Sequence, residues 1–352
     1  MNKILTLVIP TYNMEKYLDK CLSSLIVNNT KLQKQLEVLV VIDGATDRSS
    51  EIAHGYQRKY PETFVVVDKP NGNYGSCVNR GIQDARGKYI KILDADDYFD
   101  TAVFESYLSF LQSIDSDMVV NDFCSVNEDG IVQKTKHYLL GKSGSSFLFD
   151  KKIVSKFVKY NLQMHAIAYK TANLRKIDYK QTEGISYTDQ EWTFVPLMTV
   201  FSISYFSGVL YYYLVGRTGQ TMDPSVFNKS TNQNEICILR KLNDYVNSNY
   251  ENDSAKLFQN IWIHLNLAMV YRWYLVEKHF LPMKSLYDFE EKMFKIYPEG
   301  KIKTDEFVLP GTRYHFVKEW RQKKRLSGFF YELIHFYSRV YSKIERLLTH
   351  QI

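Results

Sequence analysis

The chain has 352 residues, 45% of them hydrophobic and 15% aromatic, so it is too apolar to be disordered and long enough for about two domains. Its 45 Lys and Arg against 39 Asp and Glu give a net charge of +6. From Lys301 onward there are eleven basic and five acidic residues, so the whole excess of positive charge falls in this last part. Because no zinc-finger or RNP motif accompanies the basic segment, we expect no nucleic-acid partner.

Four cysteines stand far apart, without a CxxC pair or a histidine at metal-binding spacing, which argues against a disulfide framework and a structural zinc site. The apolar start of the chain stops at Pro10 and lacks a cleavage site, so we expect no secretory signal. The apolar stretch from Leu257 to Val276 is broken by polar residues and is interpreted as a buried helix. These features favour a reducing, cytosolic location.

Short runs rich in Val, Ile and Leu alternate with helical patterns near the N-terminus. The runs predicted as buried strands are residues 4–10, 36–42, 63–67 and 89–93. This alternation predicts an α/β fold with a doubly wound, mainly parallel sheet flanked by helices. Ligands of such sheets bind beyond the carboxyl ends of the strands, so the loops after these runs are where we expect the chemistry.

The pattern continues beyond residue 100 with longer elements. We predict a helix over 103–112, a strand at 118–120 and a tyrosine-rich strand over 204–215. After Pro224 the chain becomes predominantly helical, which predicts a boundary near residue 225 and a helical C-terminal extension.

One predicted strand is followed at once by three carboxylates, those of Asp94, Asp96 and Asp97. Like charges so close together are costly unless a cation is bound, and hard oxygen ligands suit Mg²⁺ or Mn²⁺ held between the protein and a diphosphate. The alternative is a solvated turn that caps the helix starting near Thr101. Asp43, at another strand end, and the flexible loop from Asn71 to Gly75 favour a nucleotide site.

Three segments, in chain order, resemble the nucleotide-sugar half of family 2 glycosyltransferases, which are inverting enzymes of the GT-A fold: VIPTYN, DGATD and NGNYGSCVNRGIQDARGKYIKILDADD. The resemblance implies that Pro10 and Tyr12 belong to the donor site, with Tyr12 stacked near the uracil. It further implies that Asp43 hydrogen-bonds to the uracil ring, and that Asn71 and Asn73 belong to the loop beside the base.

The same resemblance gives roles to the acidic motif. Asp94 opens it, and Asp96 and Asp97 reach the ribose and hold the diphosphate-bound metal, Mn²⁺ or Mg²⁺. The chain departs from the family's pattern at Ile42, where a second acid is common, and at Ala45, where a Ser is common. The contact with the base is therefore expected to depend on Asp43 alone.

The segment Tyr187-Thr188-Asp189-Gln190-Glu191-Trp192 resembles the family's acidic-acidic-x-x-aromatic element, with Thr188 in place of the first acid. The resemblance implies that Asp189 is the catalytic base, with Trp192 packed behind it, and Glu191 is the main competitor for that role. The alternative is that Thr188 or Asp189 only caps a helix over 190–198.

Two further residues are candidates on the acceptor side. His165 lies in a segment that resembles the family's acceptor-side strand, where it would line the acceptor pocket or serve as a core histidine. Arg217, in a Gly-flanked loop, could clamp a phosphate as a bidentate donor or belong to a surface turn.

The C-terminal tail forms a third region of interest. From Leu326 onward apolar residues recur at helical spacing, after the basic segment Arg321 to Arg325, so we predict a basic amphipathic helix. Its aromatic residues favour an anionic membrane surface. A homodimer through a heptad seam and packing onto the catalytic domain are the alternatives.

Together these features predict a metal-dependent inverting glycosyltransferase that moves a sugar from a UDP-sugar to a glycan or lipid-linked acceptor in bacterial surface polysaccharide assembly. We expect a catalytic domain over 1–224, divided into a nucleotide-sugar half (1–100) and an acceptor half (101–224), and a helical region over 225–352. The expected location is cytoplasmic, peripheral on the inner face of the membrane. A nucleotidyltransferase and a catalytically weak sugar-nucleotide-binding or scaffold protein are the alternatives.

Overall fold

The structure is a computed structural model, and it describes residues 2–217, 231–277, 282–309 and 312–324. The chain divides into two compact units, the first formed by residues 1–237 and 249–258, the second by residues 238–248 and 259–352. The predicted boundary near residue 225 lies outside the described residues, so the division into 1–224 and 225–352 stays a prediction.

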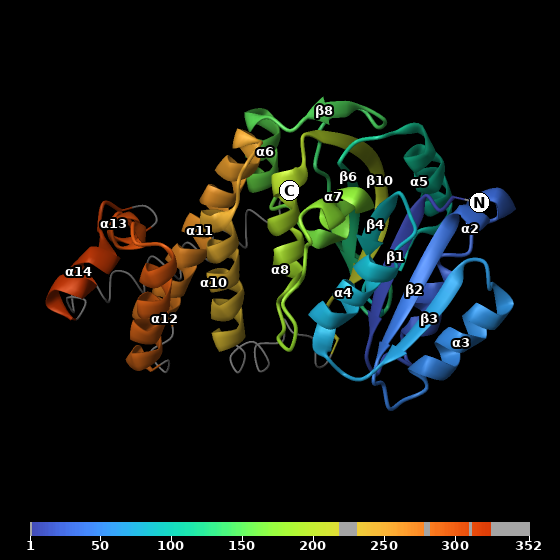
Figure 1. The fold of residues 1–352 in the computed structure, drawn as a ribbon, viewed down its shortest axis with the longest axis horizontal. Helices are drawn as coiled ribbons and strands as arrows, with labels where there is room; N and C mark the ends of the chain where they lie inside the picture. The colour runs from blue at the N-terminus through green and yellow to red at the C-terminus, as the bar shows by residue number, and fades with distance from the viewer. Residues whose placement is uncertain (1, 218–230, 278–281, 310–311, 325–352) are drawn as a thin grey trace. The chain divides into compact units, whose positions relative to one another are not determined.

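The first unit is built around a single sheet (Figure 1). Its strands are β1 Leu5–Thr11, β2 Leu36–Asp43, β3 Phe64–Lys69, β4 Tyr89–Ile92, β5 Tyr98–Phe99, β6 Met118–Val126, β7 Val132–Lys136, β8 Ser146–Leu148, β9 Ile167–Lys170 and β10 Ser202–Leu214. The order across the sheet is β3-β2-β1-β4-β9-β6-β10-β5, with β7 paired to β6 and β8 paired to β10.

The sheet is mixed, and its longest ladders are parallel. Strands β1 to β4 pair in parallel as predicted, and β6 pairs in parallel with β10. Strand β9 lies between β4 and β6 and is antiparallel to both, so it joins the two parallel groups. In the first group Thr11 is level with Ile42, and Ile42 is level with Asp68, so the loops after β1, β2 and β3 begin at the same edge of the sheet.

Helices cover this sheet. They are α1 Leu18–Ser23, α2 Thr30–Gln35, α3 Ser49–Lys59, α4 Asn73–Asp84, α5 Thr101–Ser113, α6 Lys151–Lys159, α7 Thr171–Lys176 and α8 Asp189–Trp192, with 3₁₀ turns at Met164–Ala166 and Val195–Thr199. Helix α4 packs on β1 and β2, where Gly81 lies against Val8 so closely that a Cβ would come within 2.4 Å of a Val8 methyl carbon. This close approach fixes the position of the α4 N-terminus beside the strand ends.

Burial explains why the strands read as continuous apolar runs. Every residue of β2 is buried, and so is every residue of β1 except Pro10. Strands covered on both faces carry apolar side chains at successive positions, without the alternation of a half-exposed sheet. The few polar residues inside these strands are buried with partners, as Thr6 is when it donates to Glu37 over 2.7 Å.

The second unit is helical. Its described elements are α10 Thr231–Asn247, which begins in the first unit, α11 Asp253–Arg272, a π-helical turn at Trp273–Glu277, α12 Met283–Ile296, α13 Gly300–Asp305 and α14 Phe316–Lys323. The stretch predicted as a helix from Leu257 to Val276 lies in α11 and the π-helical turn. Among the described residues no helix is long and apolar enough to cross a membrane.

Arg321 has a different role from the one its position before the tail suggests. Its guanidinium donates to Glu290 Oε1 over 2.6 Å and to Asp305 Oδ1 over 2.5 Å, and it also reaches the Tyr271 hydroxyl and Thr304 Oγ1. Arg321 therefore joins α11, α12, α13 and α14 inside the second unit. The predicted amphipathic helix from Leu326 lies outside the described residues.

Candidate functional site

Residues Asp94 to Asp97, which we call the acidic turn, follow β4 at the edge of the sheet where the ligand was expected. Asp97 is buried, with its Oδ2 accepting from the Tyr211 hydroxyl over 2.6 Å and its Oδ1 accepting from the Leu214 amide over 2.7 Å. Asp100 caps α5 by accepting from the Val103 amide over 2.9 Å. Because Asp100 provides the cap, the carboxylates of the turn are not needed for that purpose.

Asp94 points toward a second element of the site. Its Oδ1 accepts a 2.9 Å hydrogen bond from the hydroxyl of Tyr74, which lies in the first turn of α4. Burial first, and then the negative charge of Asp96, raise the pKa of Asp94 to about 7. Burial likewise raises the pKa of Asp97, with Asp96 and Asp94 as further causes. The turn thus concentrates negative charge in a place where a cation would be stabilised.

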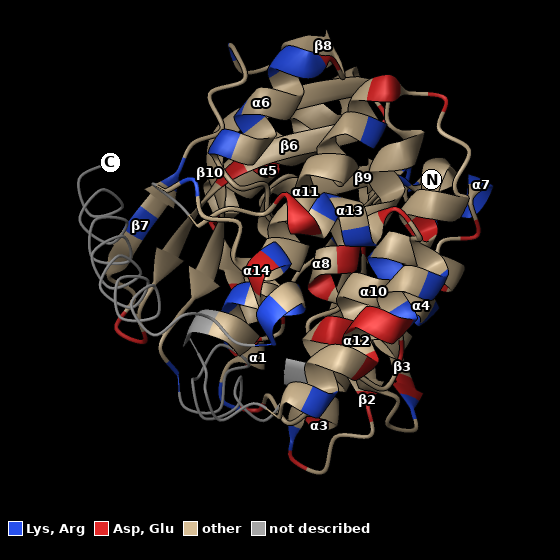
Figure 2. Cartoon of the chain, turned by 90° about the vertical axis from the view of Figure 1, so that its left-hand side faces the viewer, with Lys and Arg blue, Asp and Glu red and all other residues tan. Residues whose placement is uncertain are grey.

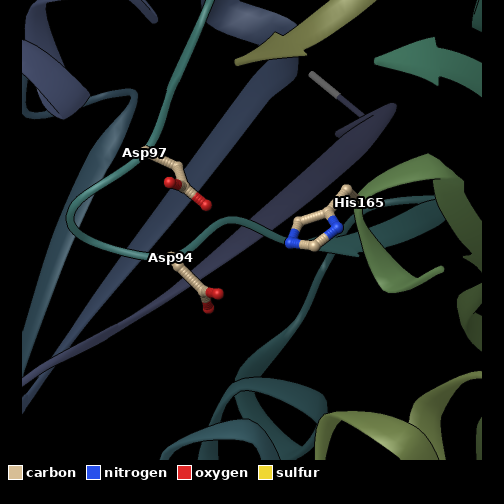
Figure 3. A group of neighbouring side chains, drawn as sticks. All are labelled: Asp94, Asp97 and His165. Atoms are coloured by element: carbon tan, nitrogen blue, oxygen red, sulfur yellow. The ribbon is translucent and has the colours of Figure 1, made fainter. Parts of the chain in front are cut away.

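His165 joins this turn from a distant part of the chain. One ligand atom each from Asp94, Asp97 and His165 lie within 4.8 Å of one another. Figure 3 shows the three side chains directed toward one another, with the two aspartates on the turn after β4 and the histidine opposite. The His165 ring is held by stacking on Tyr213, at 4.4 Å between ring centres, and by an edge contact with Tyr211 at 4.9 Å.

The chemistry of this cluster fits a divalent metal. Among the described residues, the buried Nδ1 of His165 has no hydrogen-bond partner. Burial also lowers the pKa of His165 to about 3, so the imidazole is neutral and has a lone pair to donate. Two carboxylates and a neutral imidazole are a donor set that Mn²⁺ accepts. This set differs from the predicted metal ligands, Asp96 and Asp97. It keeps Asp97, and Asp94 and His165 take the place of Asp96.

Asp96 faces the other side of the turn. Its Oδ2 forms a 2.5 Å ion pair with Nε of Arg217, and both side chains are largely buried. The Arg217 guanidinium also lies over the ring of Tyr17, with its central carbon 5.7 Å from the ring centre. The structure thus brings Arg217 to the acidic turn, as expected for a site residue. The roles of Asp96 in ribose and metal binding stay predictions.

Asp43 organises the predicted uridine loop. It is buried at the end of β2, where its carboxylate accepts from the amides of Gly72 and Asn73, each over 2.9 Å, and pairs with the Lys69 ammonium. The side-chain amide of Asn71 donates to the Asp43 carbonyl over 3.0 Å. Asp43, Asn71 and Asn73 therefore form one connected loop. A contact between Asp43 and a base would use a remaining lone pair of its carboxylate.

The loop after β1 begins beside the loop after β2, because Thr11 is level with Ile42 in the sheet. Pro10 is half-buried within β1, whereas the ring of Tyr12 is 48% exposed. Asn13 has φ of 53° and accepts from the Thr46 amide over 2.8 Å, which ties this loop to the one after β2. Tyr12 is thus an exposed aromatic ring at the strand edge, where a base could stack.

Asp189 lies at the start of α8 and acts electrostatically on the acidic turn. Its charge is among the causes that raise the pKa values of Asp94 and Tyr74. Thr188 precedes the helix but makes no capping bond, because its Oγ1 accepts from the Gln181 amide over 2.9 Å. Asp189 therefore belongs to the same site as the predicted metal ligands.

The predicted helix over 190–198 is wrong in its length. Helix α8 ends at Trp192, and a 3₁₀ turn follows from Val195. Pro196 lies at the start of this turn, where its missing N–H cannot continue an α-helix. Trp192 is buried against the edge of the Tyr169 ring, at 5.2 Å between ring centres.

Glu191 holds a neighbouring segment of the chain through its side chain. Its side chain is buried and Oε2 accepts from the Thr182 amide over 2.8 Å. The same segment packs against α4, since a Cβ on Gly75 would come within 1.9 Å of the Thr182 carbonyl oxygen. Glu191 thus holds the segment that borders the donor loop.

Several site residues were not singled out from the sequence. Tyr74 was visible only as part of a loop motif, Lys69 as part of a turn, and Tyr211 as one of several tyrosines in a strand. His165 was considered for the acceptor pocket and not for metal binding. The signal for these residues is tertiary, because each becomes informative only through a partner from another element: Asp43 for Lys69, Asp94 for Tyr74 and Asp97 for Tyr211.

A parallel group of strands that ends in an acidic turn and continues through β9 into a mixed group is the arrangement of the GT-A fold. The family model described as "Glycosyl transferase family 2" matches residues 6–180. The chain therefore belongs to glycosyl transferase family 2 through the domain that these residues form.

Curated relatives match parts of the chain. An uncharacterized glycosyltransferase of Mycoplasma pneumoniae is 38% identical over 122 residues, which are 34% of this chain and 39% of that protein. A poly(ribitol-phosphate) beta-glucosyltransferase of Bacillus spizizenii is 30% identical over 220 residues, 62% of this chain and 33% of that protein. The chain thus matches well under half of the length of these relatives.

Solved structures support the fold over nearly the whole chain. The crystal structure of Staphylococcus aureus TarS 1–349 in complex with UDP has a TM-score of 0.64 and 20% sequence identity, and the match covers 96% of this chain and 91% of that one. The complex of the same protein with UDP-GlcNAc has a TM-score of 0.63 and 20% identity, with 92% of each chain covered.

Proposed function

We propose that the protein transfers a sugar from a UDP-sugar to a hydroxyl of a glycan or lipid-linked acceptor, with inversion at the anomeric carbon. The observation that carries the proposal is the cluster of Asp94, Asp97 and His165 at the carboxyl edge of the sheet, with Asp189 close enough for its charge to raise the pKa of Asp94. A base and a cation-binding turn at one edge are the two elements that an in-line displacement from a diphosphate needs. The complexes of TarS with UDP and UDP-GlcNAc support this choice of donor.

In the proposed donor site, Tyr12 offers an exposed ring on which the uracil stacks, and the loop of Asp43, Asn71 and Asn73 lies along the edge of the base. Lys69 holds Asp43 and so keeps this loop in place. Asp96 and Arg217 would lie toward the ribose and the diphosphate.

Asp94, Asp97 and His165 would hold the divalent metal, Mn²⁺ or Mg²⁺. A metal bound there would offset the negative charge that grows on the leaving diphosphate. Tyr74 and Tyr211 orient the two carboxylates by donating to Asp94 and Asp97. Support for this assignment comes from His165, whose buried Nδ1 has no hydrogen-bond partner among the described residues and which brings one ring nitrogen within 4.8 Å of Asp94 and Asp97.

Asp189 would remove the proton of the acceptor hydroxyl as that oxygen attacks the anomeric carbon from the face opposite UDP. Such general-base assistance typically contributes about 10² to 10⁴ in rate. Glu191, which already holds Thr182, is the weaker candidate.

The biological setting extends the proposal. The poly(ribitol-phosphate) beta-glucosyltransferase of Bacillus spizizenii supports a role in bacterial surface polysaccharide assembly. A cytoplasmic location, peripheral on the membrane, and a membrane or dimer contact through the tail stay predictions.

The test is a panel of UDP-, GDP- and dTDP-sugars, in which release of the nucleoside diphosphate is measured with Mn²⁺ and with EDTA. We expect release from one or a few UDP-sugars, and only with the metal. Binding of none of the UDP-sugars in the presence of Mn²⁺ would overturn the proposed donor, and equal rates with EDTA would overturn the metal.

A further inference from the structure

A concentration of positive charge lies in the acceptor half of the first unit, although the sequence count placed the excess only in the tail. Between residues 130 and 160 the chain carries Lys134, Lys136, Lys142, Lys151, Lys152, Lys156 and Lys159, which we call the lysine surface. Asp150 is the only acidic residue in this interval, and it is used to cap α6 by accepting from the Lys152 and Ile153 amides.

Four lysines of this surface are not paired with a carboxylate in the described part of the chain. In the part of the chain that the structure describes, no ion pair is formed by Lys136, Lys142, Lys151 or Lys152. Lys142, Lys151 and Lys152 are exposed. Other exposed lysines of the first unit pair with an acid, as Lys16 does with Glu128 and Lys34 does with Glu62. The lysine surface therefore has charge available for a partner.

The fold explains why these lysines face outward. Helix α6 buries Ile153, Val154 and Phe157, and this apolar stripe forces the lysines of the helix onto the opposite face. Figure 2 shows the blue segments of α6 and of β7, which pairs only with β6 at the side of the sheet.

The lysine surface continues to the acidic turn through Lys136. The Lys136 ammonium donates to the carbonyl of Asn161 over 3.2 Å and lies over the Phe123 ring, 5.8 Å from its centre. The Phe123 ring is in turn 5.1 Å from the ring of His165, between ring centres. The Phe123 ring therefore lies between Lys136, the half-buried end of the lysine surface, and His165, the proposed metal ligand.

We propose that the lysine surface binds a polymeric acceptor that carries a negative charge on each repeat, and guides its growing or modified end toward His165 and Asp189. The inference rests on the proposed glycosyl transfer and names the acceptor class for it. A flexible charged chain can follow the lysines from α6 to the half-buried Lys136, whereas a flat lipid surface would meet only the exposed lysines.

The physical basis of such binding is the release of counterions from the polymer. For a single-stranded polyanion the slope of log K against log salt is about −0.7 per neutralised charge. Binding by several lysines should therefore weaken steeply as salt is added. Two exposed leucines beside the surface, Leu139 at 57% and Leu148 at 77%, make an anionic membrane the competing partner.

The experiment measures binding of fluorescent linear polyphosphate to the full chain over a range of salt concentrations. The test variant changes Lys142, Lys151 and Lys152 to Gln. The matched control changes Lys31, Lys59 and Lys180 to Gln, which are exposed lysines of the same unit outside the lysine surface. Both variants keep the basic tail and lose the same charge, so a difference between them reports position.

We expect the test variant to bind polyphosphate about tenfold more weakly at low salt and to lose about two units of the salt slope, with the control unchanged. Release of UDP from the donor should be the same in all three proteins. Equal loss in both variants, or no loss in either, would overturn the acceptor surface. Stronger binding of the wild type to phosphatidylglycerol vesicles than to polyphosphate, abolished by the same three changes, would assign the surface to a membrane instead.

Failure of the donor proposal gives a different result. A wild type that releases no UDP but binds polyphosphate through these lysines would leave the surface intact and remove the glycosyl transfer. A wild type that releases UDP but does not bind polyphosphate at low salt would keep the glycosyl transfer and remove the acceptor role of the lysine surface.

Discussion

The hydroxyl of Tyr74 donates to Oδ1 of Asp94 over 2.9 Å, and this bond joins the first turn of α4 to the acidic turn after β4. The two residues lie at opposite ends of the third segment that resembles the family, and α4 also holds the loop that Asp43 organises. Tyr74 therefore couples the nucleotide loop to the proposed metal ligands.

The first prediction concerns this coupling. Tyr74→Phe removes one hydrogen bond to a largely buried carboxylate, which typically costs about 1 to 3 kcal/mol. We expect UDP to bind about tenfold more weakly in the presence of Mn²⁺, with little change in its absence. Isothermal titration with Mn²⁺ and with EDTA measures both values. An equal loss under both conditions would place Tyr74 in the base loop alone.

The sequence predicted this half of the site because its parts are close in the chain or at equivalent strand ends. Asp43, the loop at Asn71 to Asn73 and the acidic turn all follow strands of one parallel group, and that group was predicted correctly. His165 could not be placed in the same way, since its position depends on β9 entering the sheet between β4 and β6. Such long-range pairing leaves no periodic signal in the sequence.

The lysine surface shows a second limit of the sequence. A balanced charge over residues 1–300 concealed it, because a net count cannot tell dispersed charge from charge gathered on one face. These lysines are gathered on one face for two reasons. The acids elsewhere in the unit pair with other residues, and the opposite face of α6 is buried.

The second prediction concerns metal binding by His165. His165→Ala removes a neutral nitrogen ligand and should weaken Mn²⁺ binding by about tenfold or more, by analogy with changes around metal ligands. The unfolding temperature is measured with UDP, with Mn²⁺ and with both together. The wild type should gain more from both together than from the two separately, and the variant should lose this extra stabilisation, which we call the synergy. The control is His54→Ala, a histidine on α3 whose partner is Asp68.

An unchanged synergy in His165→Ala would return the metal to Asp96 and Asp97 alone. Asp96→Asn then separates the two assignments, because Asp96 is paired with Arg217 and lies outside the Asp94, Asp97 and His165 cluster.

The third prediction separates the two candidate bases. Asp189→Asn keeps the shape of the side chain but removes the base, so sugar transfer should fall by about 10² or more while UDP affinity stays near wild type. Glu191→Gln retains an oxygen that accepts from Thr182 and should keep most of the activity. Transfer rates and UDP affinities of both variants are compared. The opposite ranking would assign the base to Glu191.

The fourth prediction is a pH dependence of stability. Burial first, and then the charge of Lys134, lower the pKa of Lys136 from 10.5 to about 8. His165 also faces Lys136 electrostatically but is neutral in this range, because its pKa is about 3. Between pH 8 and 10.5 the unfolded chain keeps the Lys136 proton and the folded chain does not, so raising the pH favours the folded state.

The free energy of unfolding should therefore rise more steeply with pH in the wild type than in Lys136→Met across that window. Denaturant titrations at several pH values measure the difference, in which the other lysines and tyrosines cancel. Lys142→Met is the control, because Lys142 is exposed and is not among the causes that lower the pKa of Lys136, and the wild-type slope should persist there. Parallel curves for the wild type and Lys136→Met would contradict the prediction.

The last prediction concerns Arg321, which the sequence assigned to the basic tail. In the structure its guanidinium binds the carboxylates of Glu290 and Asp305 and is largely buried between helices of the second unit. Arg321→Ala would leave Glu290 without its cation in a buried position, and breaking a buried pair costs about 3 to 5 kcal/mol. The variant should unfold at a markedly lower denaturant concentration, whereas Lys318→Ala, at an exposed position of the same helix, should unfold like the wild type. The consequence for the tail is specific: a truncation that removes residues 321–352 would confound loss of the tail with loss of this network, and a truncation after Lys324 would not. If both truncations were equally stable, the network around Arg321 would not contribute to the stability of the second unit.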